Sequence, residues 1–270
     1  HDVATRLVSD NRVGFFSFIG SAKVGWMLRS KLAPGTRCAL EHGGVAPVIV
    51  AADTYMDDTV ALLSKAGFYH AGQVCVSVQR VFVEKSIAWE LAQRIAKAGN
   101  MMTIGDPTLP NTDIGPLIRP AETDRIHAWL QEAVSLGAKL ITGGEKISDS
   151  CYQTTVLLNP PADCTISRNE VFGPVICIYE YEDIDDAIAQ ANSLDVSFQA
   201  AVFSKKIDTC MHAFRHLDAS AVMINDHTAF RVDWMPFAGL KHSGHGVGGI
   251  PHTFRDMQVE KMMVIRSPSL

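Results

Sequence analysis

Apolar and polar positions along the chain follow two periods, one typical of buried strands and the other of amphipathic helices. Continuous apolar runs predict strands over residues 47–51, 80–83, 139–142, 175–181, 200–203 and 221–225. Apolar positions spaced three or four residues apart predict helices over 57–67, from Ser86 onward, and over 126–133, 184–191 and 210–217. Alternating strands and helices predict an α/β fold with a largely parallel sheet.

Two stretches break this alternation. Residues 105–120 contain four prolines, which predicts an ordered loop. Residues 235–256 are rich in Gly and His with little periodicity, and a loop of that length is usually functional or lies at an interface. Residues 257–265 then predict a terminal strand that pairs with another subunit.

Composition narrows the class of protein. The 270 residues are 47% hydrophobic and 20% charged with a net charge of −5, which predicts one large or two modest globular domains. We expect no nucleic-acid partner, because no basic stripe is present, and no membrane association, because no apolar run reaches about 18 residues. The six cysteines lack metal-ligand spacing, so we expect no metal, free thiols and a cytoplasmic location. The first residue is not Met, and we expect a processed product or a fragment.

The first candidate site is the segment 18–25, where Gly20 and Ser21 lie between a predicted strand and a predicted helix. Free amides at a helix start can bind a pyrophosphate, although Ser21 can equally be an ordinary helix cap. The two glycines of the segment have the spacing of a nucleotide-binding P-loop. Trp26 and Met27 replace the Lys and Ser/Thr that such a loop requires, so that type of site is rejected.

Three further candidates are a cysteine and two acidic residues. Glu41 precedes a Gly pair that permits close approach to a ligand, although it can also belong to a solvated turn. Cys75 is predicted on a loop or at a helix start, where free amides would lower the thiol pKa from about 8.5; a buried core cysteine is the alternative. Glu170 can accept hydrogen bonds from a ribose, or be a surface carboxylate before a turn.

Taken together and in this order, the segments resemble signature motifs of the aldehyde dehydrogenase superfamily. The matching segments are FIGSAKVG at 18–25, EHGG at 41–44, GQVC at 72–75, EVFGPV at 170–175 and MPFAGLKHSG at 235–244. The resemblance covers essentially the whole chain. Three positions depart from the family pattern, namely Ile19, His42 and Ala238, and the ring of His42 next to Glu41 is expected to alter the pKa of that carboxyl.

The resemblance implies a three-layer catalytic domain with a parallel sheet over residues 43–237. Residues 1–42 would be the C-terminal remnant of a Rossmann-like cofactor domain, and 238–270 a return loop with an oligomerisation strand. The N-terminal half of the family's cofactor domain has no counterpart in the chain. We therefore expect this chain alone to be inactive. The oligomerisation strand implies that the protein is a homo-oligomer, a dimer or a tetramer.

The resemblance also implies the chemistry, which is oxidation of an aldehyde to a carboxylic acid with NAD or NADP through a thiohemiacetal and a thioester. Cys75 would be the nucleophile and Glu41 the general base. Ser21 would contact the cofactor pyrophosphate, Glu170 would bind the nicotinamide ribose, and Phe172 would pack near it.

Two alternative functions stay open at this stage. One is a dehydrogenase that passes the acyl group to CoA, against which the presence of Glu41 argues. The other is a non-catalytic structural or assembly domain. Residues 226–237 suggest a moderately apolar substrate pocket, and Arg231 within them can bind an acidic substrate or form a surface ion pair.

Overall fold

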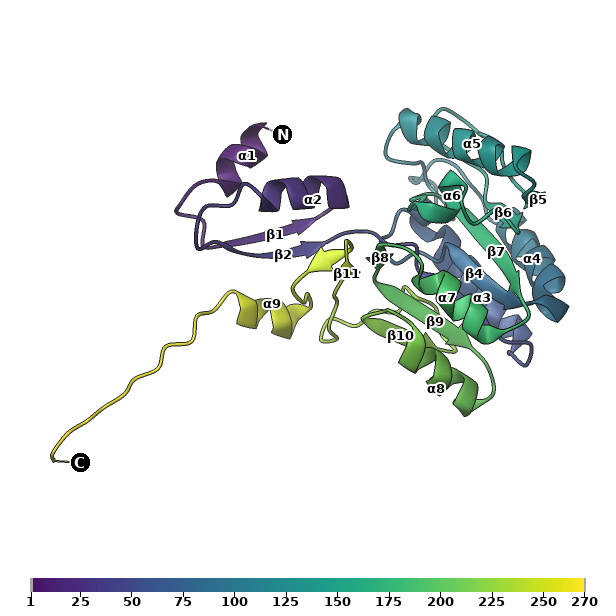
Figure 1. Cartoon of the computed structure of the whole chain (residues 1–270). Helices are drawn as coiled ribbons and strands as arrows, with labels where there is room; N and C mark the ends of the chain where they lie inside the picture. The colour runs from purple at the N-terminus through teal and green to yellow at the C-terminus, as the bar shows by residue number, and fades with distance from the viewer. Residues whose placement is uncertain (1, 270) are drawn as a thin grey trace.

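The computed structural model describes residues 2–269 and contains a larger and a smaller lobe (Figure 1). The larger lobe is built on a seven-stranded sheet in the order β10-β9-β3-β4-β7-β6-β5. Its strands are β3 (Pro47–Val50), β4 (Arg80–Glu84), β5 (Lys139–Thr142), β6 (Thr155–Leu158), β7 (Val175–Tyr181), β9 (Gln199–Phe203) and β10 (Ala221–Ile224). All neighbours pair in parallel except β5, which is antiparallel to β6.

Helices cover both faces of this sheet. In sequence order the chain passes from β3 to β4, crosses to β5 at one edge, and then returns through β6, β7 and β9 to β10 at the other edge. Because such crossovers are right-handed, α3 (Met56–Phe68) and α4 (Lys85–Asn100) lie on one face, and α7 (Ile184–Asn192) and α8 (Ile207–His216) on the other (Figure 1). Helices α5 (Pro120–Ser135) and α6 (Thr165–Arg168) pack against each other. The predicted three-layer parallel-sheet fold is confirmed.

Coverage on both faces explains why the central strands are continuous apolar runs rather than alternating ones. Every residue of β3 is buried, and so are Val81, Phe82 and Val83 of β4. Phe82 stacks on Tyr179 of β7 with ring centroids 5.2 Å apart. The core therefore holds β3, β4 and β7 rigidly side by side.

The smaller lobe contains a parallel β-α-β unit. Its elements are α1 (Asp2–Val8), β1 (Phe15–Ile19), α2 (Ala22–Arg29) and β2 (Arg37–Glu41), with β12 (Gly244–His245) added antiparallel to β2. This unit agrees with a remnant of a Rossmann-like domain. Helix α9 (Ile250–Asp256) follows, and the chain end then extends away from both lobes (Figure 1).

The chain crosses between the lobes twice, and the two crossings are bonded to each other. The first crossing is 42–46; the second runs through β11 (Leu240–Lys241), which pairs with β8 (Val196–Ser197), to β12. The buried Ser243 joins them, because its Oγ donates to the carbonyl oxygen of Gly43 at 2.9 Å and accepts from the amide of Ser197 at 2.9 Å. This junction lies directly beside Glu41.

The structure corrects one prediction about the C-terminal part. Residues 235–256 are not an aperiodic loop, since they contain β11, β12 and α9. Residues 257–265 are exposed and pair with no strand among residues 2–269; Met262, for example, is 85% exposed. The predicted pairing of this segment involves a second copy of the chain, and it stays a prediction.

The other predicted helices and strands are confirmed, with small shifts at their ends. The loop predicted over 105–120 ends one residue early, because Pro120 occupies the first turn of α5, where its missing N–H costs nothing. The predicted domain boundaries after residues 42 and 237 stay predictions. Among residues 2–269, no helix has both the length and the apolar character that crossing a bilayer requires.

Candidate active site

Three loops of the larger lobe meet at one end of its sheet. Residues 42–46 lead into β3, residues 73–79 into β4, and residues 169–174 into β7. These three strands are parallel neighbours, so their amino ends lie side by side. Ligands of open α/β sheets usually bind at the carboxyl ends. Here the candidate residues gather at the opposite end, next to the crossing from the smaller lobe.

Two glycines allow the loops to touch. Gly72 has φ +69°, and a side chain there would overlap the backbone of Gly173, so the segment before Cys75 lies directly on the segment after Glu170. A side chain at Gly43 would overlap the carboxylate of Glu170. These contacts explain why glycine stands at each place and why Glu170 reaches the lobe crossing.

Glu41 is the last residue of β2, not part of a solvated turn. It pairs with Ile19 of β1 and Gly244 of β12, and its backbone carbonyl accepts from the amide of Gly20 at 3.1 Å. Its carboxylate lies against Gly248. Burial raises the pKa of this carboxyl and the charge of Arg231 lowers it, with burial the larger effect.

Cys75 lies in the turn after the short helix η1 (Tyr69–Gly72) and is half-buried, so it is not a core residue. The predicted lowering of its thiol pKa is wrong. Burial raises the pKa to about 11, and the charges of Glu170 and Glu41 raise it further than its own backbone amide and Arg231 can lower it. The two carboxylates are thus close enough to Cys75 to act on it electrostatically.

Glu170 carries a buried oxygen without a partner. Within the described residues, its Oε1 has no hydrogen-bond donor, and burial raises the pKa of the carboxyl to about 7 against the lowering effect of Arg125. Buried acceptors are normally satisfied, so an orphaned one at the edge of a cluster suits an incoming hydroxyl. A ribose hydroxyl fits this requirement.

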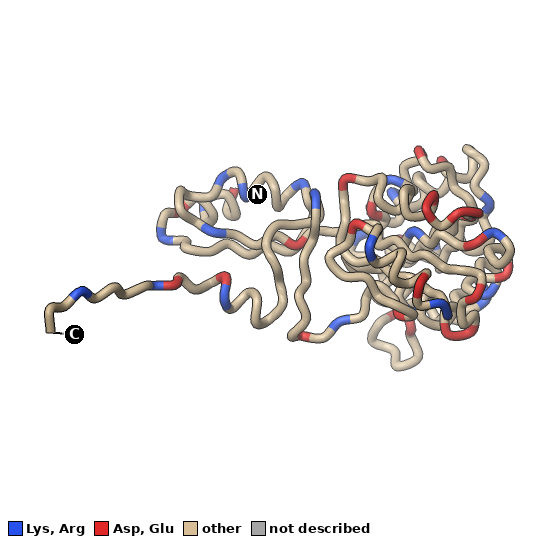
Figure 2. Tube along the Cα trace, turned by 60° about the horizontal axis from the view of Figure 1, so that its bottom comes forward, with Lys and Arg blue, Asp and Glu red and all other residues tan. Residues whose placement is uncertain are grey.

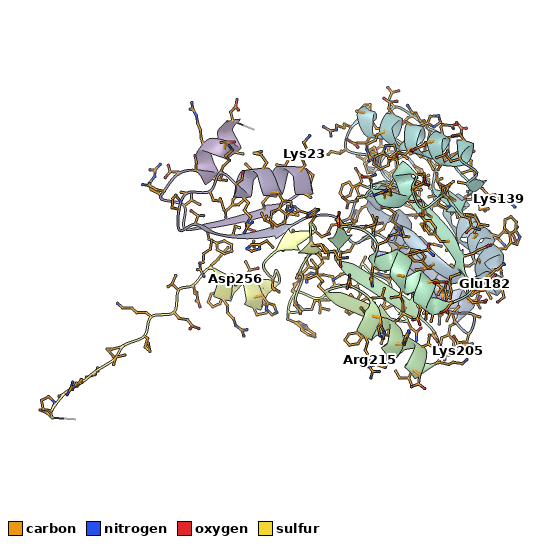
Figure 3. All side chains as sticks on the ribbon, in the orientation of Figure 1. Lys23, Lys139, Glu182, Lys205, Arg215 and Asp256 are labelled. Atoms are coloured by element: carbon orange, nitrogen blue, oxygen red, sulfur yellow. The ribbon has the colours of Figure 1, made fainter. Side chains whose placement is uncertain are left out.

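Phe172 and Ser21 each lie near a cleft. Phe172 is in the left-handed backbone region (φ +47°) and lines a cleft of about 730 Å³ together with Gln73. Ser21 is the N-cap residue of α2, as predicted, but its side chain makes no capping hydrogen bond. A cleft of about 570 Å³ at the first turn of α2 is lined by Ala22, Lys23, Trp26, Lys241 and His242. Figure 3 shows Lys23 at the end of α2 that faces the larger lobe.

His42 points away from the cluster. Successive side chains of an extended segment alternate in direction, so His42 faces α2 where Glu41 faces Gly248. Its buried ring packs against Gly25 and lies 5.9 Å from the Trp26 ring, and its Nδ1 is 2.8 Å from the carbonyl oxygen of Gly20. His42 therefore supports the turn before α2, and the raised pKa of Glu41 has other causes.

Two neighbours of Cys75 carry little signal in the sequence. Tyr69 begins η1, and its hydroxyl pKa is raised to about 12 by burial and then by Cys75. Arg231 acts on both Glu41 and Cys75 through its charge. In the sequence, Tyr69 is marked only by its position six residues before Cys75. Arg231 is marked only as a cation within residues 226–237. No group of three or more His, Cys, Asp or Glu in residues 2–269 is arranged to hold a metal ion.

The raised pKa predicts how Cys75 reacts with an uncharged alkylating reagent. Because only the thiolate is nucleophilic, the rate of Cys75 modification by iodoacetamide should rise about tenfold per pH unit up to at least pH ~10. Glu170→Gln should shift the profile to lower pH, since it removes a negative charge; Glu182→Gln, on the exposed surface, should not. Peptide mass mapping follows the rate. A plateau above a midpoint near pH ~8.5 would show that the amides dominate after all.

Comparisons with known proteins place the chain in a family. Residues 1–263 match the model of the aldehyde dehydrogenase family. The chain is 35% identical over 264 residues to 3-sulfolactaldehyde dehydrogenase from Priestia aryabhattai, covering 98% of this chain and 55% of that protein. It is 32% identical to a lactaldehyde dehydrogenase from Methanococcus aeolicus, covering 99% and 57%. The chain thus spans about half the length of the curated relatives it matches.

The fold of the chain also matches solved structures of aldehyde dehydrogenases. Glyceraldehyde-3-phosphate dehydrogenase from Methanocaldococcus jannaschii, complexed with NADP, superposes with a TM-score of 0.90 at 33% identity, covering 94% of this chain and 55% of that chain. Aldehyde dehydrogenase 21 from Physcomitrella patens, in complex with its product succinate, superposes with a TM-score of 0.91 at 32% identity, covering 95% and 53%. The family match over almost the whole chain and the shared fold establish that this chain belongs to the aldehyde dehydrogenase family.

Proposed function

We propose that the protein carrying this chain oxidises an aldehyde to a carboxylic acid with NAD or NADP. The observation that carries the proposal is the meeting of Cys75, Glu41 and Glu170 at the amino ends of β3, β4 and β7. A nucleophile, a carboxylate of raised pKa and an unsatisfied acceptor are the groups that such a reaction needs. Membership of the family supports the same conclusion.

The chain's own residues would act in two stages. Cys75 releases its proton to solvent and its sulfur adds to the aldehyde carbon, giving a thiohemiacetal whose oxyanion the Cys75 backbone amide can stabilise. A bound NAD or NADP would supply the acceptor for the hydride of this adduct, whose loss would leave a thioester on Cys75. Glu41 then takes a proton from water, which attacks the thioester; the C–S bond breaks and releases the carboxylic acid and the Cys75 thiolate. Its raised pKa brings it closer to the pH at which a general base is most effective.

Three residues fit the cofactor. Glu170 would accept hydrogen bonds from a ribose through its orphaned oxygen, and Phe172 would pack beside the ring from its cleft. Ser21, with its hydroxyl free of a capping bond, would contact the pyrophosphate at the start of α2. Basic residues outnumber acidic ones over the smaller lobe (Figure 2), which favours an anionic ligand there.

The relatives suggest a small substrate but not its charge. Those named above act, by their names, on 3-sulfolactaldehyde, lactaldehyde and glyceraldehyde 3-phosphate, and another is a betaine aldehyde dehydrogenase. We propose a small aldehyde for this chain. The two alternatives, acyl transfer to CoA and a non-catalytic assembly role, are not favoured, because Glu41 beside Cys75 suits hydrolysis.

We further propose a cytoplasmic location and a homo-oligomer. All six cysteines are free, which suits a reducing compartment. Residues 259–265 expose apolar side chains, with Val259, Met262, Met263 and Val264 each at least 80% exposed. An unpaired apolar segment of this kind is suited to adding to the sheet of a second copy.

The Glu41 assignment is tested in the complete protein. Glu41→Gln should give a burst of about one NAD(P)H per site and then stall, because the thioester forms but water lacks its base. Cys75→Ala should give no burst at all, and the surface variant Glu182→Gln should turn over normally. Stopped-flow absorbance follows the burst. Steady turnover of Glu41→Gln at the normal rate would show that another group is the base.

The proposed homo-oligomer predicts a particle mass in solution above that of the monomer. By light scattering at micromolar concentration, the chain should be at least twice its monomer mass of 29.4 kDa. A chain ending after Asp256 should dissociate toward the monomer, because the exposed segment is gone while α9 is intact. A monomeric full chain would refute the proposal.

A further inference from the structure

Residues 226–237, which we call the 226–237 loop, are pinned at both ends to the segments that carry Cys75 and Glu41. Near its start, the buried Thr228 donates its hydroxyl to the carbonyl oxygen of Val76 at 2.6 Å, next to Cys75. At its end, Phe237 exchanges two backbone hydrogen bonds with Gly248, of 3.0 and 2.7 Å. The Glu41 carboxylate lies against that same Gly248. The loop therefore runs from the segment that carries Cys75 to the segment beside Glu41.

Arg231 lies between these two anchors and its orientation is fixed. Its guanidinium stacks over the Phe237 ring with 4.4 Å between Cζ and the ring centroid, and Nη1 donates to the carbonyl oxygen of Met235 at 3.1 Å. The Phe237 ring in turn packs on Phe198 at 4.6 Å. These contacts use one face of the guanidinium and its Nη1, and within residues 2–269 they leave Nη2 and Nε free to donate.

The ion-pair interpretation of Arg231 does not hold in residues 2–269, where none of its nitrogens lies within 4.0 Å of a carboxylate oxygen. Its charge does reach Cys75 and Glu41, since it lowers the pKa of both. An exposed arginine held in place beside a nucleophile, with unused donors and no acidic partner, is suited to an anionic ligand.

Glu41 and Glu170 both act on Cys75 with negative charge, so an anionic substrate would be repelled there unless a cation offsets it. Building on the proposed function, we propose that Arg231 binds the acidic group of the substrate, so that the site selects short aldehydes that carry a carboxylate, sulfonate or phosphate. The planar fork of the guanidinium matches the oxygens that all three groups share.

The first test needs neither cofactor nor aldehyde. Iodoacetate and iodoacetamide alkylate the same thiolate, but only iodoacetate carries a carboxylate. On the 270-residue chain at one mildly alkaline pH, the ratio of their rates at Cys75 reports anion binding and cancels any change in thiol pKa. Arg231→Gln should lower this ratio about tenfold, the size of one charge-assisted contact, and Arg231→Lys should recover part of it. The control Arg215→Gln, on α8 away from the cluster (Figure 3), should leave the ratio unchanged.

An unchanged ratio in Arg231→Gln would overturn the proposal whether or not the protein oxidises aldehydes. Thermal melting of each variant checks folding, and the exposed position of Arg231 predicts a normal melt. Anion binding by Arg231 and oxidation of aldehydes by the protein are therefore tested separately.

The second test uses the complete protein with succinic semialdehyde and butanal, which differ mainly in the carboxylate. Arg231→Gln should raise KM about tenfold or more for succinic semialdehyde and leave KM and kcat for butanal near their original values. If kcat falls equally for both aldehydes, Arg231 acts through Glu41 and Cys75 instead, and the proposal is wrong.

Discussion

The carboxylate of Glu170 lying directly against Gly43 is the contact on which the rest of the site depends. Gly43 belongs to the crossing between the lobes, and Glu170 to the loop that precedes β7. Their contact leaves no room for a side chain, so it brings the amino end of the large sheet against the strand that carries Glu41. Ser243 then bonds the second crossing to the first at the same point. A site assembled from distant segments thus becomes part of a packed junction.

Charge is the second constraint at this junction. Two carboxylates and a thiol share a half-buried space, and each carboxylate makes ionisation of the thiol more costly. Cys75 is consequently a protonated, weakly reactive thiol in the chain by itself. Arg231 offsets part of the negative charge from outside, without closing the site by forming an ion pair. A cationic group that enters this space lowers the thiol pKa, so ligand binding and activation of Cys75 are electrostatically linked.

The sequence predicts the fold well where local patterns are strong. Strands such as β3 and β7 are continuous apolar runs, and helix α4 has a regular apolar period, so each is recognised from its own residues. The motifs also identify Cys75, Glu41 and Glu170, which the structure brings together. Their convergence follows from three loops that precede neighbouring parallel strands, an arrangement that depends on strand order and is invisible in any one segment.

Other features could not be predicted, because they arise between segments far apart in the chain. The thiol pKa of Cys75 is governed by burial and by Glu170, 95 residues away, rather than by local amides. The fixed orientation of Arg231 depends on Phe237 and, through Thr228, on Val76. Residues 257–265 have the composition of a strand but no paired neighbour among residues 2–269, so pairing would need a second copy of the chain.

The central claim is that close contact between Gly43 and Glu170 holds the site together, and a double-mutant cycle on unfolding free energy tests it most directly. Urea denaturation of the chain and of its Gly43→Ala, Glu170→Ala and doubly substituted forms gives the four values. Gly43→Ala should lower the free energy of unfolding by about 1–3 kcal/mol, because the added methyl overlaps the carboxylate. With Glu170→Ala already present, most of that loss should disappear, giving a coupling energy of about 1 kcal/mol or more. An equal loss in both backgrounds would contradict the account, since the methyl would then be opposed by something other than Glu170.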